Sequence, residues 1–101
     1  MTPARLAPAA RRDLLEAMQW IARDSPQAAK ALRHSFDRAA RVIGEHPESG
    51  TRRPDFVNLP YRVFSLTGFP YTIIYNADRR PPLIVRVLHG ARDMPEVLQS
   101  L

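Results

Sequence analysis

The side chains best suited to chemistry follow one apolar segment near the C-terminal end of the chain. His89 ends the segment 83–89, and Gly90, Arg92 and Asp93 come directly after it. An imidazole beside an arginine and a carboxylate could move protons or bind a polar partner. No nucleophile is placed to use His89 as a base, so a hydrogen-bonded structural histidine is the favoured interpretation.

Two interpretations of Arg92 and Asp93 stay open. The pair could contact a partner, or it could form a local clasp in which Arg92 binds a carboxylate or a strand carbonyl. Exposed ion pairs contribute only about 0–1 kcal/mol, so stability gives little reason for such a pair. Arg86 also has two interpretations, a paired arginine within the sheet or a contact for a partner's carboxylate, and pairing is favoured.

Further arginines bracket a proline-rich segment: Arg52, Arg53 and Arg62. They could line a cationic patch, or they could belong to a solvated loop. The chain carries 15 basic and 10 acidic residues, and fourteen of the basic ones are arginine. Arginine suits phosphate and carboxylate partners, but composition favours GC-biased coding, because the excess charge is shared almost evenly between the two halves.

The elements that would position these residues begin with two helices. A short strand is predicted over residues 4–7. Leu14, Met18 and Ile21 then recur at helical spacing, which predicts a helix from about Pro8 to Arg23. Ser25 and Pro26 predict a cap and a restart, and the second helix should end near residues 44–46. The short connection predicts an antiparallel helical hairpin.

Three strand signals follow a loop predicted over residues 47–60. They cover 61–67, 71–76 and 83–89, and the turns between them predict an antiparallel meander. Strict alternation would place His89 on the face of Val85 and Val87, and Arg86 on the face of Ile84 and Leu88. Asp93 could cap a short terminal helix from about residue 95. The fold class predicted is α+β, a single domain over 1–101 with the hairpin packed on a small antiparallel sheet and the N-terminal strand at its edge.

Composition limits the function classes. The chain has no cysteine, and His34, His46 and His89 lack ligand spacing, so neither a metal nor another cofactor is expected. The first residues lack a signal-peptide core, and no window approaches the ~20 apolar residues of a membrane span. We therefore expect a cytoplasmic protein without a membrane partner.

This order of elements resembles the RelE/ParE superfamily of toxins from bacterial type II toxin–antitoxin systems, and within it the ParE branch. The strongest motif is the segment 86–93, Arg-Val-Leu-His-Gly-Ala-Arg-Asp. Supporting motifs are found along the whole chain: Arg12–Leu14, His46-Pro47 with Gly50 and Arg52, Tyr61-Arg62, and Tyr71–Tyr75. The resemblance covers essentially all residues.

The superfamily implies two alternative activities. RelE-like members cut mRNA on the ribosome with basic residues and an acid–base group, whereas ParE-like members are associated with poisoning DNA gyrase. Arg62 and Arg92 match the nuclease pattern, but Phe64 and Thr72 stand where it has basic residues. The segment 95–101 offers no tyrosine for acid–base work. Each such loss typically costs ~10²-fold or more in rate, which favours the ParE activity.

The resemblance thus implies a gyrase-inhibiting toxin that is not an enzyme and is neutralised by a cognate antitoxin in a hetero-oligomer. The antitoxin's C-terminal segment is expected to wrap the toxin, filling the groove beside the hairpin and pairing with a sheet edge. A ribosome-dependent endoribonuclease using Arg62 and Arg92 is the alternative. Candidate target contacts are Arg52, Arg53, Arg62, Arg92 and Asp93, and candidate antitoxin contacts are Leu15, Trp20 and Arg86.

Overall fold

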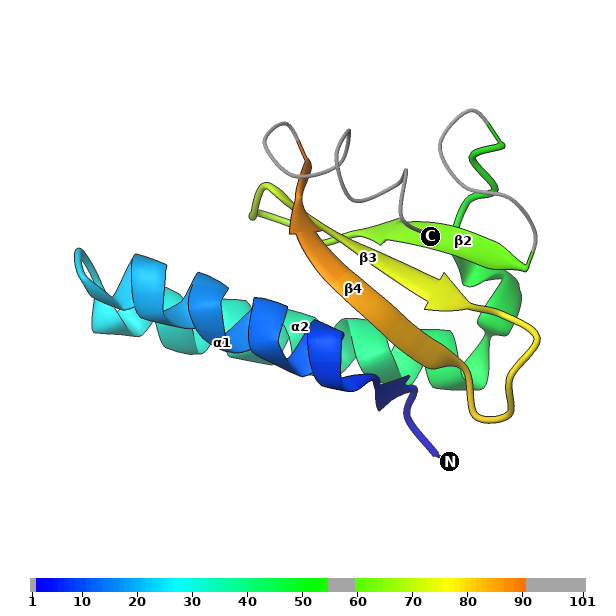
Figure 1. Cartoon of the computed structure of the whole chain (residues 1–101). Helices are drawn as coiled ribbons and strands as arrows, with labels where there is room; N and C mark the ends of the chain where they lie inside the picture. The colour runs from blue at the N-terminus through cyan, green and yellow to red at the C-terminus, as the bar shows by residue number, and fades with distance from the viewer. Residues whose placement is uncertain (1, 55–59, 91–101) are drawn as a thin grey trace.

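Two antiparallel helices cover one face of a four-stranded sheet in the computed structural model (Figure 1). The model describes residues 2–54 and 60–90. The α+β class is confirmed, and the helix predicted from about residue 95 lies outside the described residues. In chain order the elements are β1 (Arg5–Leu6), α1 (Pro8–Ala22), α2 (Pro26–Glu45), the 3₁₀ helix η1 (Pro47–Ser49), β2 (Tyr61–Ser65), β3 (Tyr71–Asn76) and β4 (Leu83–His89).

The helical hairpin forms as predicted. The Ser25 side chain accepts a hydrogen bond from the backbone N–H of Ala28 at 3.1 Å, and Pro26 begins α2. The two helices bury their apolar faces against each other and the sheet, with Leu14 and Phe36 at the centre of that core. Neither described helix combines the length and apolar character needed to cross a bilayer.

The sheet has the order β1-β4-β3-β2, and its last three strands form the predicted antiparallel meander. The N-terminal strand takes the predicted edge position, but it runs parallel to β4, with Arg5 opposite Leu83 and Leu6 opposite Ile84. The sheet is therefore mixed rather than antiparallel throughout. Strand β1 is also only two residues long, so it covers only the beginning of β4.

A β-bulge interrupts β4. Its pairing with β3 passes from Ile84 to Arg86 and leaves Val85 without a partner. As a result Ile84 and Val87 both pack in the core under the helices, whereas Val85 and Leu88 belong to an apolar cluster on the other face. The predicted strict alternation is wrong, because the extra residue reverses the facing of the strand after it.

The segment predicted as a loop after α2 is fixed to the sheet at its start. The buried Tyr75 hydroxyl donates to the Pro47 carbonyl at 2.6 Å and accepts from the Gly50 N–H at 2.8 Å. Thr51 then exchanges two backbone hydrogen bonds with Val63 of β2. A Cβ atom on Gly50 would lie 2.6 Å from the Tyr75 hydroxyl, so this close approach requires glycine.

Removal of this hydroxyl should lower stability. Tyr75→Phe leaves a buried carbonyl and N–H without their partner, and we expect a loss of about 1–3 kcal/mol in the free energy of unfolding, measured by urea titration. Tyr71→Phe is the control, because no hydrogen bond is described for that hydroxyl, and it should change stability much less. Equal losses would contradict the anchoring role.

The same residue should produce an alkaline instability. Burial raises the pKa of Tyr75 above its ordinary value of 10.0. The unfolded chain therefore loses this proton first, so stability contributed by Tyr75 is present below pH 10 and falls as the pH rises further. Tyr75→Phe should show a smaller decline than the unmodified chain in unfolding titrations between about pH 9 and 11.

Candidate functional site

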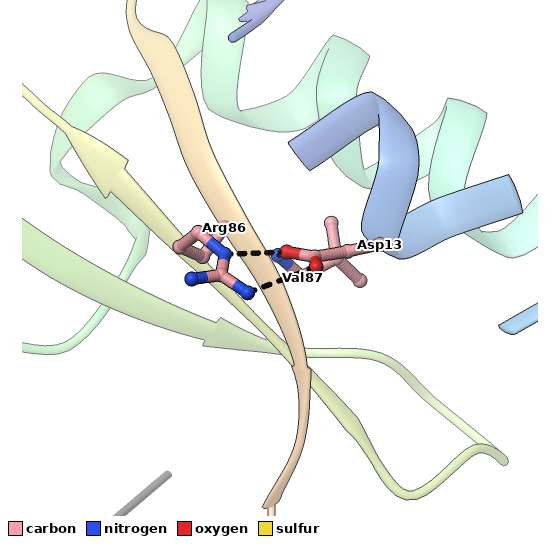
Figure 2. A network of polar contacts seen from close by, with 3 residues as sticks. All are labelled: Asp13, Arg86 and Val87. Atoms are coloured by element: carbon pink, nitrogen blue, oxygen red, sulfur yellow. Dashed lines mark hydrogen bonds and ion pairs between the residues drawn. The ribbon is translucent and has the colours of Figure 1, made fainter. Parts of the chain in front are cut away.

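An ion pair joins α1 to the central strand β4 (Figure 2). The Arg86 Nε donates to one carboxylate oxygen of Asp13 at 2.7 Å, and Nη2 donates to the other at 3.0 Å. The backbone N–H of Val87 donates to the same carboxylate at 3.0 Å. The Arg86 and Asp13 side chains are only 27% and 13% exposed, so this is a mostly buried, bidentate pair.

This geometry supports the pairing interpretation of Arg86, although its partner comes from a helix rather than from the sheet. As a candidate antitoxin contact, Arg86 would have to act from a guanidinium that already binds Asp13. Asp13 is not among the site residues predicted from the sequence, because the helical pattern places it largely outside the apolar stripe of residues 8–23. Its place in the Arg12–Leu14 motif was the one feature of the sequence that could have indicated a role for Asp13.

His89 lies beside Tyr71 at the end of β4. Their ring centroids are 5.6 Å apart with the planes at 83°, an edge-to-face contact. Tyr71 is buried in the core under the helices, on the same side of the sheet as Val87. A packed imidazole at this position supports the structural interpretation of His89.

A groove of about 430 Å³ runs between the N-terminal segment and the two helices. Apolar side chains form much of its surface, and charged ones are placed among them. The apolar group is Leu6, Leu14, Leu15, Phe36 and Ala40, and the charged group is Arg11, Arg33, Asp37 and Arg41. Leu15 is 48% exposed, so this candidate antitoxin contact is available in the groove.

The groove carries an unbalanced positive charge. Arg33 is paired with Asp37 at 3.1 Å, so these two charges offset each other. Within residues 2–54 and 60–90, neither Arg11 nor Arg41 takes part in an ion pair. A bound segment with apolar side chains and at least one carboxylate would therefore match the groove better than a purely apolar one.

Trp20, the second candidate on α1, does not line this groove. It is five residues from Leu15, which turns it about 140° around the helix. Its side chain is 60% exposed, and the Arg23 guanidinium lies 5.2 Å from the ring centre. The two proposed contacts thus belong to different faces of α1, and one straight helix could not cover both.

The predicted target contacts are only partly brought together. Arg52 and Arg62 line one pocket with Arg80, while Arg53 lines a neighbouring pocket beside β2. Arg62 also donates to the Gly50 carbonyl at 2.9 Å, so it helps to anchor the segment after α2. Arg92 and Asp93 lie outside the described residues, as does any pairing between them.

Comparison with known proteins gives matches to a family model and to solved structures. A family model described as "ParE toxin of type II toxin-antitoxin system, parDE" matches residues 4–94. The fold is similar to a solved structure described as "Chromosomal ParDE TA system from P. aeruginosa", with a TM-score of 0.68 and 18% identity over 88% of this chain and 96% of that chain. Comparison with curated proteins gave no match.

The Asp13 carboxylate should contribute far more to the free energy of unfolding than an ordinary surface carboxylate. Asp13→Ala leaves Arg86 and the Val87 N–H without their acceptor, and we expect a loss of about 3 kcal/mol in the free energy of unfolding. Asp37→Ala removes the exposed pair within α2 and should cost about 0.5 kcal/mol or less. Chemical unfolding of both variants tests this, and similar losses would show that the pair between α1 and β4 is not a main stabilising contact.

Proposed function

The chain belongs to the ParE toxin family of type II toxin–antitoxin systems, and we propose that it inhibits DNA gyrase by binding and is neutralised by a cognate antitoxin. The observation that carries the antitoxin part is the groove beside the helical hairpin. Its apolar surface fits an amphipathic, acidic segment, and so do Arg11 and Arg41, which have no ion-pair partner in the described part of the chain. Such a segment can remain disordered until it binds.

The sheet edges restrict where an antitoxin strand could pair. The outer edge of β2 is already bonded to Thr51 at its centre, Val63. On the opposite side of the sheet, at the edge of β4, the Asp13 carboxylate accepts a hydrogen bond from the Val87 N–H. Strand β1 pairs with the beginning of β4 on that same side, and its Leu6 side chain lines the groove. We propose that the strand portion of the antitoxin pairs with β1.

The gyrase part rests on family membership. We keep Arg52, Arg53, Arg62, Arg92 and Asp93 as candidate target contacts. Among these, Arg52 is exposed, and no hydrogen bond or ion pair is described for its side chain. Arg62 has a smaller part in this proposal, because it is already bonded to the segment after α2.

One observation favours gyrase binding over the ribonuclease alternative. The position of the second basic residue of the nuclease pattern is Phe64, and its side chain packs against the core under the helices. A charged residue there would have to leave that core to reach a phosphate. Of the two residues that match the nuclease pattern, Arg62 donates to the carbonyls of Gly50 and Glu48, and Arg92 lies outside the described residues.

Purified chain should inhibit supercoiling of relaxed plasmid by gyrase and should leave mRNA intact. The first assay is resolved on agarose gels, and the second uses a translation extract with primer extension. Added antitoxin should reverse the inhibition. Cleaved mRNA with unaffected gyrase would contradict the proposal and favour the RelE-like activity.

Charge in the groove should control antitoxin binding. Replacing Arg11 and Arg41 by Ala should slow association with the antitoxin about tenfold and reduce its salt dependence, as measured by surface plasmon resonance. The double variant Arg33→Ala, Asp37→Ala is the matched control within the same groove, because it removes two charged side chains that offset each other and leaves the net charge of the groove unchanged. If the control slowed association as much as the double variant, unpaired charge would not be the cause.

A further inference from the structure

A second basic surface lies away from the helical groove. Arg52 after η1, Arg62 in β2 and Arg80 in the turn between β3 and β4 line one pocket of about 170 Å³. Arg79, next to Arg80, is exposed in the same turn. We call these four residues the arginine cluster. Three segments that are distant in sequence thus place four guanidinium groups at one end of the sheet.

The cluster is not neutralised by its surroundings. Glu48 and Asp78 also line the pocket, so the local balance is two more positive than negative charges. No ion pair within 4.0 Å joins a cluster arginine to a carboxylate in the described part of the chain. Elsewhere Arg33 and Arg86 are paired in this way, so the cluster retains its charge for an external anion.

Two of the guanidinium groups are held in place by the backbone. Arg62 donates through Nη1 to the Gly50 carbonyl, and Arg80 donates through Nη1 to the carbonyls of Ala77 and Arg79. These bonds use one nitrogen of each group and leave other donors for a ligand. Fixing the side chains in advance reduces the entropy lost when an anion binds.

The surroundings of the cluster favour nucleic acid over protein. The large apolar side chains that are exposed among the described residues, Leu15, Trp20 and Val42, all belong to the helices. Protein interfaces normally need an apolar centre, which the described residues around the cluster do not provide. Phosphate contacts need only positioned cations. The described residues that line the pocket include no aromatic side chain on which an unpaired base could stack, so a duplex fits better than a single strand.

We propose that the arginine cluster binds the phosphodiester backbone of double-stranded DNA without sequence preference. This inference goes beyond the proposed function, because the partner is DNA itself and no gyrase is required. It also assigns a role to Arg79 and Arg80, which belong to none of the recurring superfamily segments found in the sequence.

The experiment measures fluorescence anisotropy of a labelled 20-base-pair duplex of arbitrary sequence, titrated with the purified chain at several salt concentrations. With about three phosphates neutralised, the logarithm of the binding constant should fall with the logarithm of salt with a slope of about −3. The double variant Arg79→Ala, Arg80→Ala should reduce this slope by about two and weaken binding at least tenfold at low salt.

A matched control removes the same charge elsewhere. Arg23 and Arg38 are exposed on the helical hairpin, so Arg23→Ala with Arg38→Ala keeps the net charge of the cluster variant. This control should retain most of the binding. Arg52→Ala provides a second test within the cluster, because no hydrogen bond of its side chain supports the fold. It should reduce the slope by about one.

Several outcomes would overturn the inference: no binding at low salt, equal losses in the cluster and control variants, tighter binding of a single strand of the same length, or equally effective competition by an acidic peptide. The gyrase assay distinguishes this inference from the proposed function. If the chain binds duplex DNA but leaves supercoiling unaffected, the DNA-binding inference stands and only the gyrase proposal is contradicted.

Discussion

The contact on which the rest of the structure depends is the one between the Asp13 carboxylate and β4. Strand β1 pairs with the first two residues of β4, and within residues 2–54 and 60–90 no strand lies beside the later backbone donors on that side. The Asp13 carboxylate of α1 accepts hydrogen bonds from the Val87 N–H and from the Arg86 guanidinium at the same time. A side chain thus replaces a missing strand and fixes the hairpin against the sheet. The groove depends on this contact, because α1 forms one of its walls.

The two candidate binding surfaces have different physical characters because different elements build them. The groove lies on helices whose apolar side chains continue from the core to the surface, so it offers burial as well as charge. The arginine cluster lies after η1, in β2 and in the turn between β3 and β4. Backbone carbonyls orient two of its guanidinium groups, and no large apolar side chain is exposed there among the described residues. The anchor from Tyr75 to Gly50 keeps η1 in place beside the cluster. Apolar burial suits a folding peptide, and fixed charge suits a polyanion.

Local signals predicted the helices and strands well, since caps, helical spacing and β-branched runs act within a few residues. Ser25 caps α2 for that reason. The parallel pairing of β1, the bulge at Val85 and the bond from Tyr75 to Gly50 all depend on partners far along the chain. Asp13 is the clearest case, because its partner Arg86 is 73 residues away. Its polar side chain interrupts no apolar pattern, so periodicity gave no indication that it turns toward the sheet.

Edge protection explains why the groove and β1 should act together. Thr51 occupies the centre of the β2 edge, and Asp13 occupies the open part of β4, so both long strands at risk of unwanted pairing are covered by this chain itself. Among the described residues, the two of β1 form a further edge, next to the Ala4 N–H that donates to the Ala40 carbonyl of α2. This edge is too short to hold a strand by backbone bonds alone. A partner strand there needs further contacts, and the neighbouring groove supplies them through Leu6, Leu15 and the unpaired arginines. The proposed antitoxin strand would therefore be selected by its fit to the groove as well as by its pairing with β1.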